Sequence, residues 1–552
     1  MDAVAAATGG AMAMAAAAVL LLCAFIYAAW LAPAAARRRL RGAGFDGPRP
    51  SFPFGNLPEI TASLQASAAA KKPSSSSSAV SSDIHGAVFP YFVRWRESFG
   101  KVFVYWLGTE PFLYVADPEF LKAATAGALG KRWGKPDVFR RDRMPMFGRG
   151  LVMAEGDEWA RHRHIIAPAF SATNLNDMIG LMQETTAKML AEWTDAVAPS
   201  AGGAVVDVER SVVRNAAEII AKASFGVADD EAGARVFRKL QAMQAMLFQS
   251  NRLVGVPLAR LLHVRKTYDA WRLGREIDAL LMEIIDARRR RRAAGSGDKG
   301  GKDLLSLLLA GTEATAGAER RLTTRELVDE CKTFFFGGHE TTALALSWTL
   351  LMLAAHPDWQ DALREEVARE VGDHQNLDAA ALGRLTKMGW VMSEVLRLYP
   401  PSPNVQRQAL EDVAAEGKSS VVIPRGTNMW VDVVAMHHDV ELWGADAHEF
   451  RPERFGRDPV QGGCRHRMGF LPFGFGGRIC VGRNLTAMEY RVVLAMLLRR
   501  FRVSVAPEYR HAPKIMLSLR PSNGIQLHLT PLVEVVDHAA AAAAAADTSS
   551  SA

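Results

Sequence analysis

The ten residues FGFGGRICVG, at positions 473–482, carry the most specific chemical signal in the 552-residue chain. Four glycines in this stretch exclude a regular helix or strand, and they permit positive φ angles and close approach of the backbone to a flat or bulky group. Cys480 closes the loop, and residues 484–498 have a helical pattern. A thiolate at a helix N-terminus is stabilised by the dipole and free N–H groups, which suits an anionic metal ligand. Arg478 adds a cation for an acidic group of a cofactor.

The spacing of Phe473, Gly476, Arg478, Cys480 and Gly482 resembles the haem-binding loop of the cytochrome P-450 family. The resemblance implies that Cys480 is the metal ligand, an axial thiolate on the iron of haem b (iron protoporphyrin IX). It also implies that Phe473 and Arg478 border the cofactor. A free buried cysteine in a glycine-rich turn is the alternative for a single cysteine. Five matched positions in ten residues disfavour that alternative.

Two further segments resemble motifs of the same family. Glu394 and Arg397 lie three residues apart on one face of a predicted helix, as in the family's ExxR helix. Arg454 lies in the segment FRPERF, residues 450–455, which resembles the family's PERF segment. The resemblance implies a buried network of these three side chains with a structural role. Alone, the pair Glu394–Arg397 would be an ordinary surface ion pair of little energy.

The segment GGHETT, residues 337–342, falls within a long predicted helix and is expected to interrupt it. Two glycines in a helix interior cost about 1 kcal/mol each, so a functional gain should offset them. The segment resembles the family's oxygen-activation motif, with Gly337 where alanine is more usual. This implies that Thr341 positions a proton-delivering water and that Glu340 links it to solvent. The alternative is a kinked core helix whose threonine bonds its own backbone.

Three more side chains resemble the family's propionate-binding residues. The segment WARHR, residues 159–163, resembles the family's WxxxR helix, which implies that Trp159 and Arg163 hold a haem propionate. Arg407 occupies the position of another propionate-binding arginine. Arginine suits carboxylates because its guanidinium is planar and always charged. Taken singly, each residue is equally consistent with a surface or packing role.

The N-terminal stretch predicts a membrane anchor. No charged residue occurs in positions 3–36, and the apolar residues 11–31 are long enough for a bilayer core of ~30 Å. Four arginines follow in positions 37–41. By the positive-inside rule they hold the body in the cytosol, which predicts a single-pass membrane protein. The family resemblance implies that this membrane is the endoplasmic reticulum. A cleaved signal peptide is the main alternative, but it requires a basic segment before the apolar run. An alanine-rich disordered leader is the other.

Composition limits the function classes. With 49% hydrophobic and 23% charged residues, the chain is neither disordered nor a many-span membrane protein. Four cysteines without a CxxC pair exclude a zinc ribbon and a disulfide scaffold, and they indicate a reducing compartment. The net charge of +7 is compatible with an anionic membrane, an acidic protein or nucleic acid. We expect a membrane and an acidic reductase, and no nucleic acid.

The local patterns also predict individual elements and boundaries. Helices are predicted from the capping box at Thr323 to about Ala355, over residues 357–372 and over residues 386–399. Strands are predicted over residues 102–107, 420–423 and 515–529, the last with a hairpin turn at residues 521–524. The five arginines 288–292 are predicted to form a solvated helix end. The predicted domains are a membrane anchor (1–34), a basic, proline-rich hinge (35–60), a haem-thiolate monooxygenase catalytic domain (61–535) and a disordered tail (536–552).

The resemblance extends from about residue 47 to 532 and implies the mainly α cytochrome P-450 fold with a small β-rich lobe. It implies a haem-thiolate monooxygenase that uses O₂ and electrons from NADPH, delivered by an NADPH–cytochrome reductase. The substrate would be a small apolar or amphipathic molecule. The sequence resembles the plant clan acting on cytokinins, brassinosteroids, gibberellins, triterpenoids and fatty acids, and we favour a cytokinin-hydroxylase-like enzyme. A haem-thiolate isomerase or dehydratase, a non-catalytic haem-binding protein and a structural membrane protein without haem are the alternatives.

Overall fold

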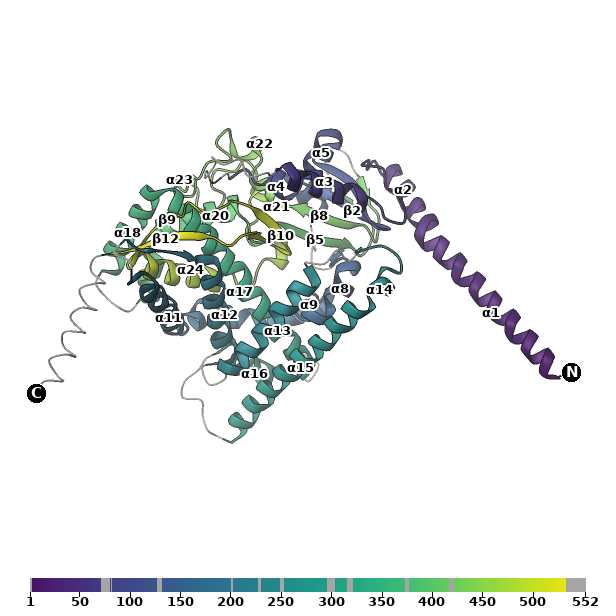
Figure 1. The fold of residues 1–552 in the computed structure, drawn as a ribbon, viewed down its shortest axis with the longest axis horizontal. Coiled ribbons are helices and arrows are strands. Elements are labelled where there is room, and N and C mark those ends of the chain that lie inside the picture. Colours follow the sequence, from purple (N-terminus) through teal and green to yellow (C-terminus); the bar gives the residue numbers. More distant parts are fainter. Residues whose placement is uncertain are drawn as a thin grey trace, which may run out of the picture.

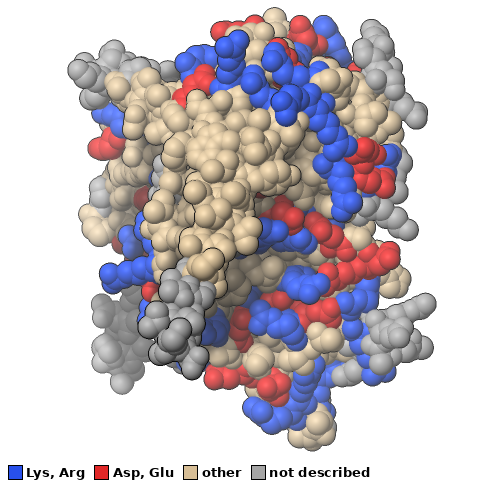
Figure 2. Space-filling model, turned by 90° about the vertical axis from the view of Figure 1, so that its right-hand side faces the viewer, with Lys and Arg blue, Asp and Glu red and all other residues tan. Residues whose placement is uncertain are grey.

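The N-terminal helices form a rod that projects from the body of the protein (Figure 1). The rod consists of α1 (Asp2–Ile26), the π-helical turn η1 (Tyr27–Leu31) and α2 (Ala32–Gly42). The stretch Met12–Gly42 is long and apolar enough to cross a membrane, and it makes little contact with the rest of the chain. Figure 2 looks onto this side of the molecule, where the projecting apolar surface is tan and Lys and Arg side chains gather above it.

The last helix of the rod continues through the arginines in positions 37–41 and ends at Gly42. Leu40 is buried against the body, and Arg39 forms an ion pair with Asp412 at 2.8 Å. The second half of α2 is therefore docked rather than free. The computed structural model describes residues 2–70, 80, 82–126, 132–199, 202–226, 230–248, 253–294, 303–314, 321–372, 377–415 and 421–532. The predicted tail at 536–552 lies outside these residues.

The body is mainly helical, as the sequence predicted, and the described side chains bury one continuous hydrophobic core. Its longest helix, α17 (Thr324–Ala355), runs through the middle of the molecule and is buried along nearly its whole length (Figure 1). The other helices are α3 (Leu57–Ala70), α4 (His85–Val88), α5 (Pro90–Phe99), α6 (Pro118–Ala124), α8 (Asp137–Phe147), α9 (Gly156–Ile166), α10 (Ala172–Asn176), α11 (Ile179–Val197), α12 (Val208–Phe225), α13 (Asp230–Phe248), α14 (Ala259–Leu262), α15 (Val264–Ala293), α16 (Leu304–Ala314), α18 (Pro357–Val371), α19 (Ala379–Arg384), α20 (Thr386–Leu398), α21 (Val433–His437), α22 (Val440–Trp443), α23 (Glu453–Arg457) and α24 (Arg483–Leu498), with 3-10 turns η2 (Ala167–Phe170), η5 (Arg467–Gly469) and η6 (Gly476–Arg478).

Small sheets form the β-rich part. The largest has the strand order β1-β2-β8-β5-β3, in which β2 and β8 are parallel and the other neighbours antiparallel. A second sheet has the order β4-β12-β9, and β10-β11 and β6-β7 are two-stranded. The strands are β1 (Val102–Leu107), β2 (Glu110–Val115), β3 (Trp133–Gly134), β4 (Ala204–Asp207), β5 (Asn404–Ala409), β6 (Val413–Ala415), β7 (Val421–Ile423), β8 (Asn428–Asp432), β9 (Phe501–Val505), β10 (Pro513–Met516), β11 (Ser518–Pro521) and β12 (Gln526–Pro531).

Local signals predicted the helix starts well. The capping box at the start of α17 is present: the Thr323 N–H donates to Glu326 Oε2 at 2.7 Å, and the Glu326 N–H donates to Thr323 Oγ1 at 3.2 Å. α18 starts at Pro357 as predicted, α20 covers the predicted third helix, and β1 has the predicted bounds. These signals are reliable because caps and prolines act within a few residues.

Three local predictions were wrong. The glycines at 337 and 338 do not interrupt α17, which is continuous through them because its neighbours hold it on all sides. The segment 521–524 does not close a hairpin, since β11 pairs with β10 whereas β12 pairs with β4 and β9. The arginines at the end of α15 are not all solvated: Arg288 is buried and donates to Asp303 at 2.5 Å.

Candidate active site

Cys480 lies at the end of an irregular loop, directly before α24. The Cys480 N–H donates to the Phe473 carbonyl at 2.9 Å, which closes the loop around the turn η6. Gly474 and Gly476 have φ angles of 75° and 63°, so the backbone favours glycine at both positions. The helix predicted after the cysteine is α24, which begins at Arg483. The fold thus presents one thiol at the N-terminus of a long helix.

The electrostatic surroundings of Cys480 act in two directions. The residue is exposed, although the protein packed around the sulfur partly withdraws it from water. This desolvation raises the pKa of the thiol above its ordinary value. The N–H groups of Gly482 and Arg483 and the cations Arg163 and Arg483 oppose the rise by stabilising the thiolate. A metal ion bound to the sulfur would deprotonate it outright.

The guanidinium of Arg407 is buried, and that of Arg478 in the same region is half-buried. Burial first, and then the charge of Arg478, lower the pKa of Arg407 to about 9. Burial also lowers the pKa of Arg478 to about 10, which Glu155 opposes. Within the described part of the chain, neither guanidinium forms an ion pair, and the Nε of each has no hydrogen-bond partner. The two predicted residues Arg407 and Arg478 are thus brought together without a compensating carboxylate in contact.

The helix α9 packs Trp159 and Arg163 against the cysteine loop. The guanidinium of Arg478 lies over the Trp159 ring, 4.8 Å from its centroid, and its Nη2 donates to the Ala154 carbonyl at 2.7 Å. Arg163 Nη1 donates to the Ile479 carbonyl at 2.8 Å. Both predicted residues of α9 therefore contact the cysteine loop: Trp159 through the side chain of Arg478, and Arg163 through the backbone carbonyl of Ile479.

The helix α17 carries Thr341 and Glu340, whose side chains have different surroundings. Thr341 Oγ1 donates to the Gly337 carbonyl at 3.0 Å, the backbone bond that the alternative interpretation of this segment anticipated. Glu340 is buried and accepts from Gln244 Nε2 at 3.0 Å and from Ser518 Oγ at 2.5 Å. The acid is thus bound to α13 and β11, while the threonine stays on its own helix.

The side chains of Glu394, Arg397 and Arg454, predicted to form a buried network, come together between α20 and α23. Arg397 donates through Nε and Nη2 to the Glu394 carboxylate at 2.7 and 2.8 Å, with both side chains fully buried. Arg454 Nε lies 3.5 Å from Glu394 Oε1. Arg397 Nη1 also donates to the Ala447 carbonyl at 2.6 Å, and Nη2 donates to the Glu449 carbonyl at 3.1 Å. This bidentate pair ties α20 to the segment before α23.

Comparison with known proteins identifies the family. The cytochrome P-450 family model matches residues 79–529. A cytokinin hydroxylase of Arabidopsis thaliana is 36% identical over 508 residues, which cover 91% of this chain and 94% of the relative. Cytochrome P-450 714C2 of Oryza sativa subsp. japonica is 34% identical and covers 92% of this chain and 95% of the relative.

The chain belongs to the cytochrome P-450 family. It is a haem-thiolate monooxygenase with the mainly helical fold and small sheets of that family. One N-terminal apolar helix is consistent with membrane anchoring.

The residues present fit the P-450 haem. A haem carries two carboxylates and needs an anionic sulfur ligand. The site offers the Cys480 thiol, the buried guanidinium of Arg407 and the half-buried guanidinium of Arg478, and neither guanidinium has an ion-pair partner among the described residues. Lys135 also senses these cations: burial first, and then Arg407 and Arg478, lower its pKa well below its ordinary value, and an anion bound there would favour its charged form again. A Cβ built at Gly337 would meet no atom within 4 Å, so α17 leaves space beside its backbone there.

Sequence reasoning missed several residues around these P-450 motifs. One is Glu155, which accepts from the Lys135 N–H at 2.6 Å and from Arg140 Nη1 at 3.0 Å, and which opposes the lowering of the Arg478 pKa. Gln244 and Ser518, the partners of Glu340, come from segments about 100 residues upstream and 180 downstream. No local pattern marks them, because an ordinary glutamine or serine acquires a role only from what folds against it.

Proposed function

We propose that this cytochrome P-450 hydroxylates a small amphipathic plant metabolite of the cytokinin class. It would take electrons from NADPH through an NADPH–cytochrome reductase. The observation that carries the proposal is the alignment of nine-tenths of the chain with a cytokinin hydroxylase, together with a thiol that the loop places directly before α24, at the position expected for the iron ligand. Relatives with other names, such as cytochrome P-450 714C2 and cytochrome P-450 734A4 of Oryza sativa subsp. japonica, are 34% and 35% identical to this chain, close to the 36% of the cytokinin hydroxylase. An experiment must therefore decide the substrate class.

Cys480 is the proposed iron ligand, and the surrounding groups favour its charged form. The haem supplies the activation of O₂ when bound, and the thiolate donates electron density to it. The N–H groups of Gly482 and Arg483 and the cation Arg163 stabilise the negative sulfur. Phe473 fixes the loop through its carbonyl, which accepts from Cys480 at 2.9 Å. These contacts preorganise the ligand before any cofactor arrives.

The propionate-binding role is proposed for Trp159, Arg163 and Arg407, with Arg478 as a further cation for an acidic group of the cofactor. The guanidiniums of Arg407 and Arg478 each keep Nε without a partner among the described residues, and Arg407 is withdrawn from water. A carboxylate placed there would gain charge-assisted hydrogen bonds, and it would restore the depressed pKa of each arginine. Trp159 supports Arg478 through its ring face, which fixes the direction of the guanidinium.

Proton delivery is proposed for Thr341 and Glu340. The Thr341 hydroxyl donates to the Gly337 carbonyl at 3.0 Å and keeps its oxygen lone pairs available for a water. Glu340 Oε1 lies 3.6 Å from Arg520 Nε, and Arg520 Nη2 lies 3.1 Å from Glu209, which is half-buried. Because an arginine stays protonated in proteins, Arg520 would orient Glu340 towards Glu209, and water beside these groups would carry the protons to solvent. The buried Glu394–Arg397–Arg454 trio has a structural role in this proposal.

Membrane attachment is proposed through residues 1–34, with the body on the cytosolic side of the endoplasmic reticulum. The exposed apolar rod and the arginines at its base suit a single-pass anchor of that orientation. A reductase on the same membrane would then meet the body by diffusion in two dimensions. Basic residues near the cysteine loop, such as Arg483, suit an acidic partner.

The first test addresses the iron ligand. The full-length protein and its Cys480→Ala and Cys464→Ala variants are purified, reduced and exposed to carbon monoxide. We expect the Soret band of thiolate-ligated haem in the wild type and in Cys464→Ala, and its absence in Cys480→Ala. The same band in all three proteins, or in none of them, would contradict the assignment.

The second test addresses the substrate. The haem-loaded protein is reconstituted with reductase and NADPH and given cytokinins, brassinosteroids, gibberellins, triterpenoids and fatty acids in parallel. We expect a cytokinin product that is one oxygen atom heavier, formed only with NADPH and reductase. Turnover confined to another class would overturn the cytokinin proposal and leave the monooxygenase assignment intact.

A further inference from the structure

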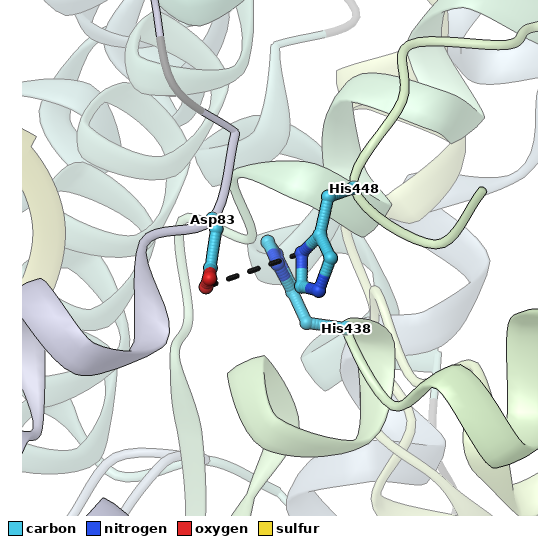
Figure 3. Close-up of side chains that lie close together, drawn as sticks. All are labelled: Asp83, His438 and His448. Atoms are coloured by element: carbon cyan, nitrogen blue, oxygen red, sulfur yellow. Dashed lines mark ion pairs between the residues drawn. The ribbon is translucent and has the colours of Figure 1, made fainter. Parts of the chain in front are cut away.

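Three potential metal ligands converge on the side of the body where α4 and α21 meet (Figure 3). Asp83 precedes α4, His438 directly follows α21, and His448 lies in the loop between α22 and α23. One ligand atom of each lies within 4.8 Å of the others. The closest charged contact, His448 Nδ1 to Asp83 Oδ1, is 3.9 Å, which is too long for a hydrogen bond. The three groups therefore face one another without bonding one another.

The protonation of His438 is fixed by its outer hydrogen bond. Nε2 lies 2.8 Å from the Leu398 carbonyl, which only accepts, so Nε2 carries the proton. The other nitrogen, Nδ1, then holds a lone pair directed at the cluster. The residue is 5% exposed, and Nδ1 has no hydrogen-bond partner in the described part of the chain. A buried lone pair without a donor is costly, and a histidine whose far N–H is held by a carbonyl is the usual arrangement of a metal ligand.

His448 supplies the second unsatisfied nitrogen. Its Nδ1 is buried and, among the described residues, also lacks a hydrogen-bond partner. The rings of His438 and His448 lie 5.6 Å apart between centroids. Each ring therefore offers a nitrogen that no donor in the described part of the chain satisfies.

We infer that Asp83, His438 and His448 form a binding site for a divalent transition metal of the zinc class. Two imidazole nitrogens and one carboxylate oxygen are a donor set that such ions prefer, with water in the fourth position. Tetrahedral bonds of 2.0–2.1 Å separate ligand atoms by about 3.4 Å, so the 4.8 Å cluster must contract slightly on binding. The Asp83 carboxylate provides this movement, since its side chain is 62% exposed.

The other cluster of similar composition, Glu158, His162 and Glu326, lacks these features. Both ring nitrogens of His162 already contact carboxylates: Nδ1 lies 2.6 Å from Glu330, and Nε2 lies 3.2 Å from Glu326. Arg161 also bonds Glu326. Its lone pairs and charges are satisfied within the protein, so a cation would have to displace existing partners. The inference is therefore confined to the first cluster.

The proposed site would reinforce the structure behind the cysteine loop. His448 lies between Ala447 and Glu449, whose carbonyls accept hydrogen bonds from Arg397. The carbonyl that accepts from His438 belongs to Leu398, the residue after Arg397. A bound ion would fasten the segment before α4 to this buried network. We therefore expect it to stabilise the fold rather than to take part in oxygen chemistry.

The binding test uses the full-length, haem-loaded protein after treatment with a chelator. Zinc chloride is titrated by calorimetry into the wild type, Asp83→Asn, His448→Asn and His164→Asn. The first two variants change side chains that are at least a third exposed, and an unchanged haem spectrum reports that they fold. His164 is an exposed histidine outside the cluster and serves as the matched control.

We expect one zinc ion per protein in the wild type and in His164→Asn, and the loss of that ion in Asp83→Asn and His448→Asn. Zinc should also raise the thermal unfolding midpoint by a few degrees in the wild type and not in His448→Asn. Equal binding by all four proteins would reveal adventitious surface sites and overturn the inference. Absence of stoichiometric binding to the wild type would also overturn it.

Discussion

Arg407 and Arg478 hold charges that the surrounding protein does not neutralise by contact. Burial lowers the pKa of both guanidiniums, and the charge of Arg478 also lowers the pKa of Arg407. The folded protein without a bound anion therefore bears an electrostatic cost there. A dicarboxylate cofactor removes this cost. Haem retention and the folding of this region are therefore expected to depend on each other.

Arg407→Gln tests that dependence. A hydrogen bond between charged groups contributes about 1.5–3 kcal/mol, so we expect haem to dissociate about tenfold to a hundredfold more readily. Transfer of haem to an excess of apomyoglobin, followed by absorbance, measures the loss. Arg510→Gln, at an exposed arginine, is the matched control and should retain haem as the wild type does. Equal transfer rates for all three proteins would remove Arg407 from the site.

His162 predicts a specific pH dependence of stability. Burial by itself lowers the pKa of its ring, but hydrogen bonds and charges of Glu330 and Glu326 outweigh burial, and the net pKa is raised above its ordinary value. The carboxylate of Glu326 is ionised, because hydrogen bonds from Arg161 and Thr323 outweigh its partial burial and hold its pKa at about 2. The folded state therefore binds the imidazolium proton more tightly than the unfolded state.

The raised pKa of His162 determines whether stability rises or falls with pH. A raised pKa gives stability that is complete below the unfolded value of about 6.5 and is lost as pH rises through the folded value. We expect the thermal unfolding midpoint to fall over the range above pH 6.5, with a smaller fall in His162→Gln. His164 lies two residues further along α9 and is exposed, so the pH profile of His164→Gln should follow that of the wild type. A His162→Gln protein with the wild-type pH profile would refute this assignment.

At the scale of elements, α17 combines two adjacent glycines with different surroundings. A Cβ at Gly337 would meet nothing within 4 Å, whereas a Cβ at Gly338 would lie 2.6 Å from Ile220 Cγ1. Gly338 thus allows α12 and α17 to pack closely, and Gly337 opens space beside the helix backbone. The continuity of α17 through both residues comes from this packing, since isolated helices disfavour glycine.

The two glycines should respond oppositely to alanine. Gly337→Ala gains about 1 kcal/mol of helix propensity without a clash, so its free energy of unfolding should rise or stay level. Gly338→Ala gains the same propensity but overpacks Ile220, which costs about 1–3 kcal/mol, so it should lose stability. Chemical denaturation of the two variants measures the difference. A less stable Gly337→Ala beside an unaffected Gly338→Ala would contradict the packing described.

At the scale of the whole molecule, apolar surface collects on the side from which the anchor leaves. Besides the rod, Leu258, Leu261 and Leu262 around α14 are 59%, 67% and 72% exposed. The segment before them is tied to the turn between β1 and β2, where the Thr109 N–H donates to the Gly255 carbonyl at 2.9 Å. Both α14 and the base of the rod lie at the right-hand edge of the body in Figure 1.

Deletion of residues 2–31 should therefore release the protein from membranes only in part. The deletion keeps Arg39 and Leu40, whose contacts dock α2, so the body should fold and bind haem. Residual flotation with anionic lipid vesicles is expected, and Leu261→Ser with Leu262→Ser should reduce it. Val460→Ser, at an equally exposed residue after α23, is the control. Complete release by the deletion alone would show that α14 makes no membrane contact.

Sequence by itself determined the family, the helical class, the cysteine loop, the capped start of α17 and the apolar rod. These features are written in residues that lie within about ten positions of one another, where spacing, caps and glycine content act locally. Short motifs also located Glu394, Arg397 and Arg454. The first two lie in the ExxR segment, and the third lies in the segment FRPERF. Their contact with one another was implied by the family and is seen in the fold.

Only the tertiary structure decided which distant groups meet. It paired Glu340 with Gln244 and Ser518, buried Arg288 on Asp303, and separated β11 from β12 into different sheets. It also brought the lone pair of His438 to Asp83 and His448, two residues that no motif contains. The physical reason is that burial and partnership are properties of a position in space. Segments hundreds of residues apart set the dielectric surroundings and the hydrogen bonds of each group, and no short stretch of sequence carries that information.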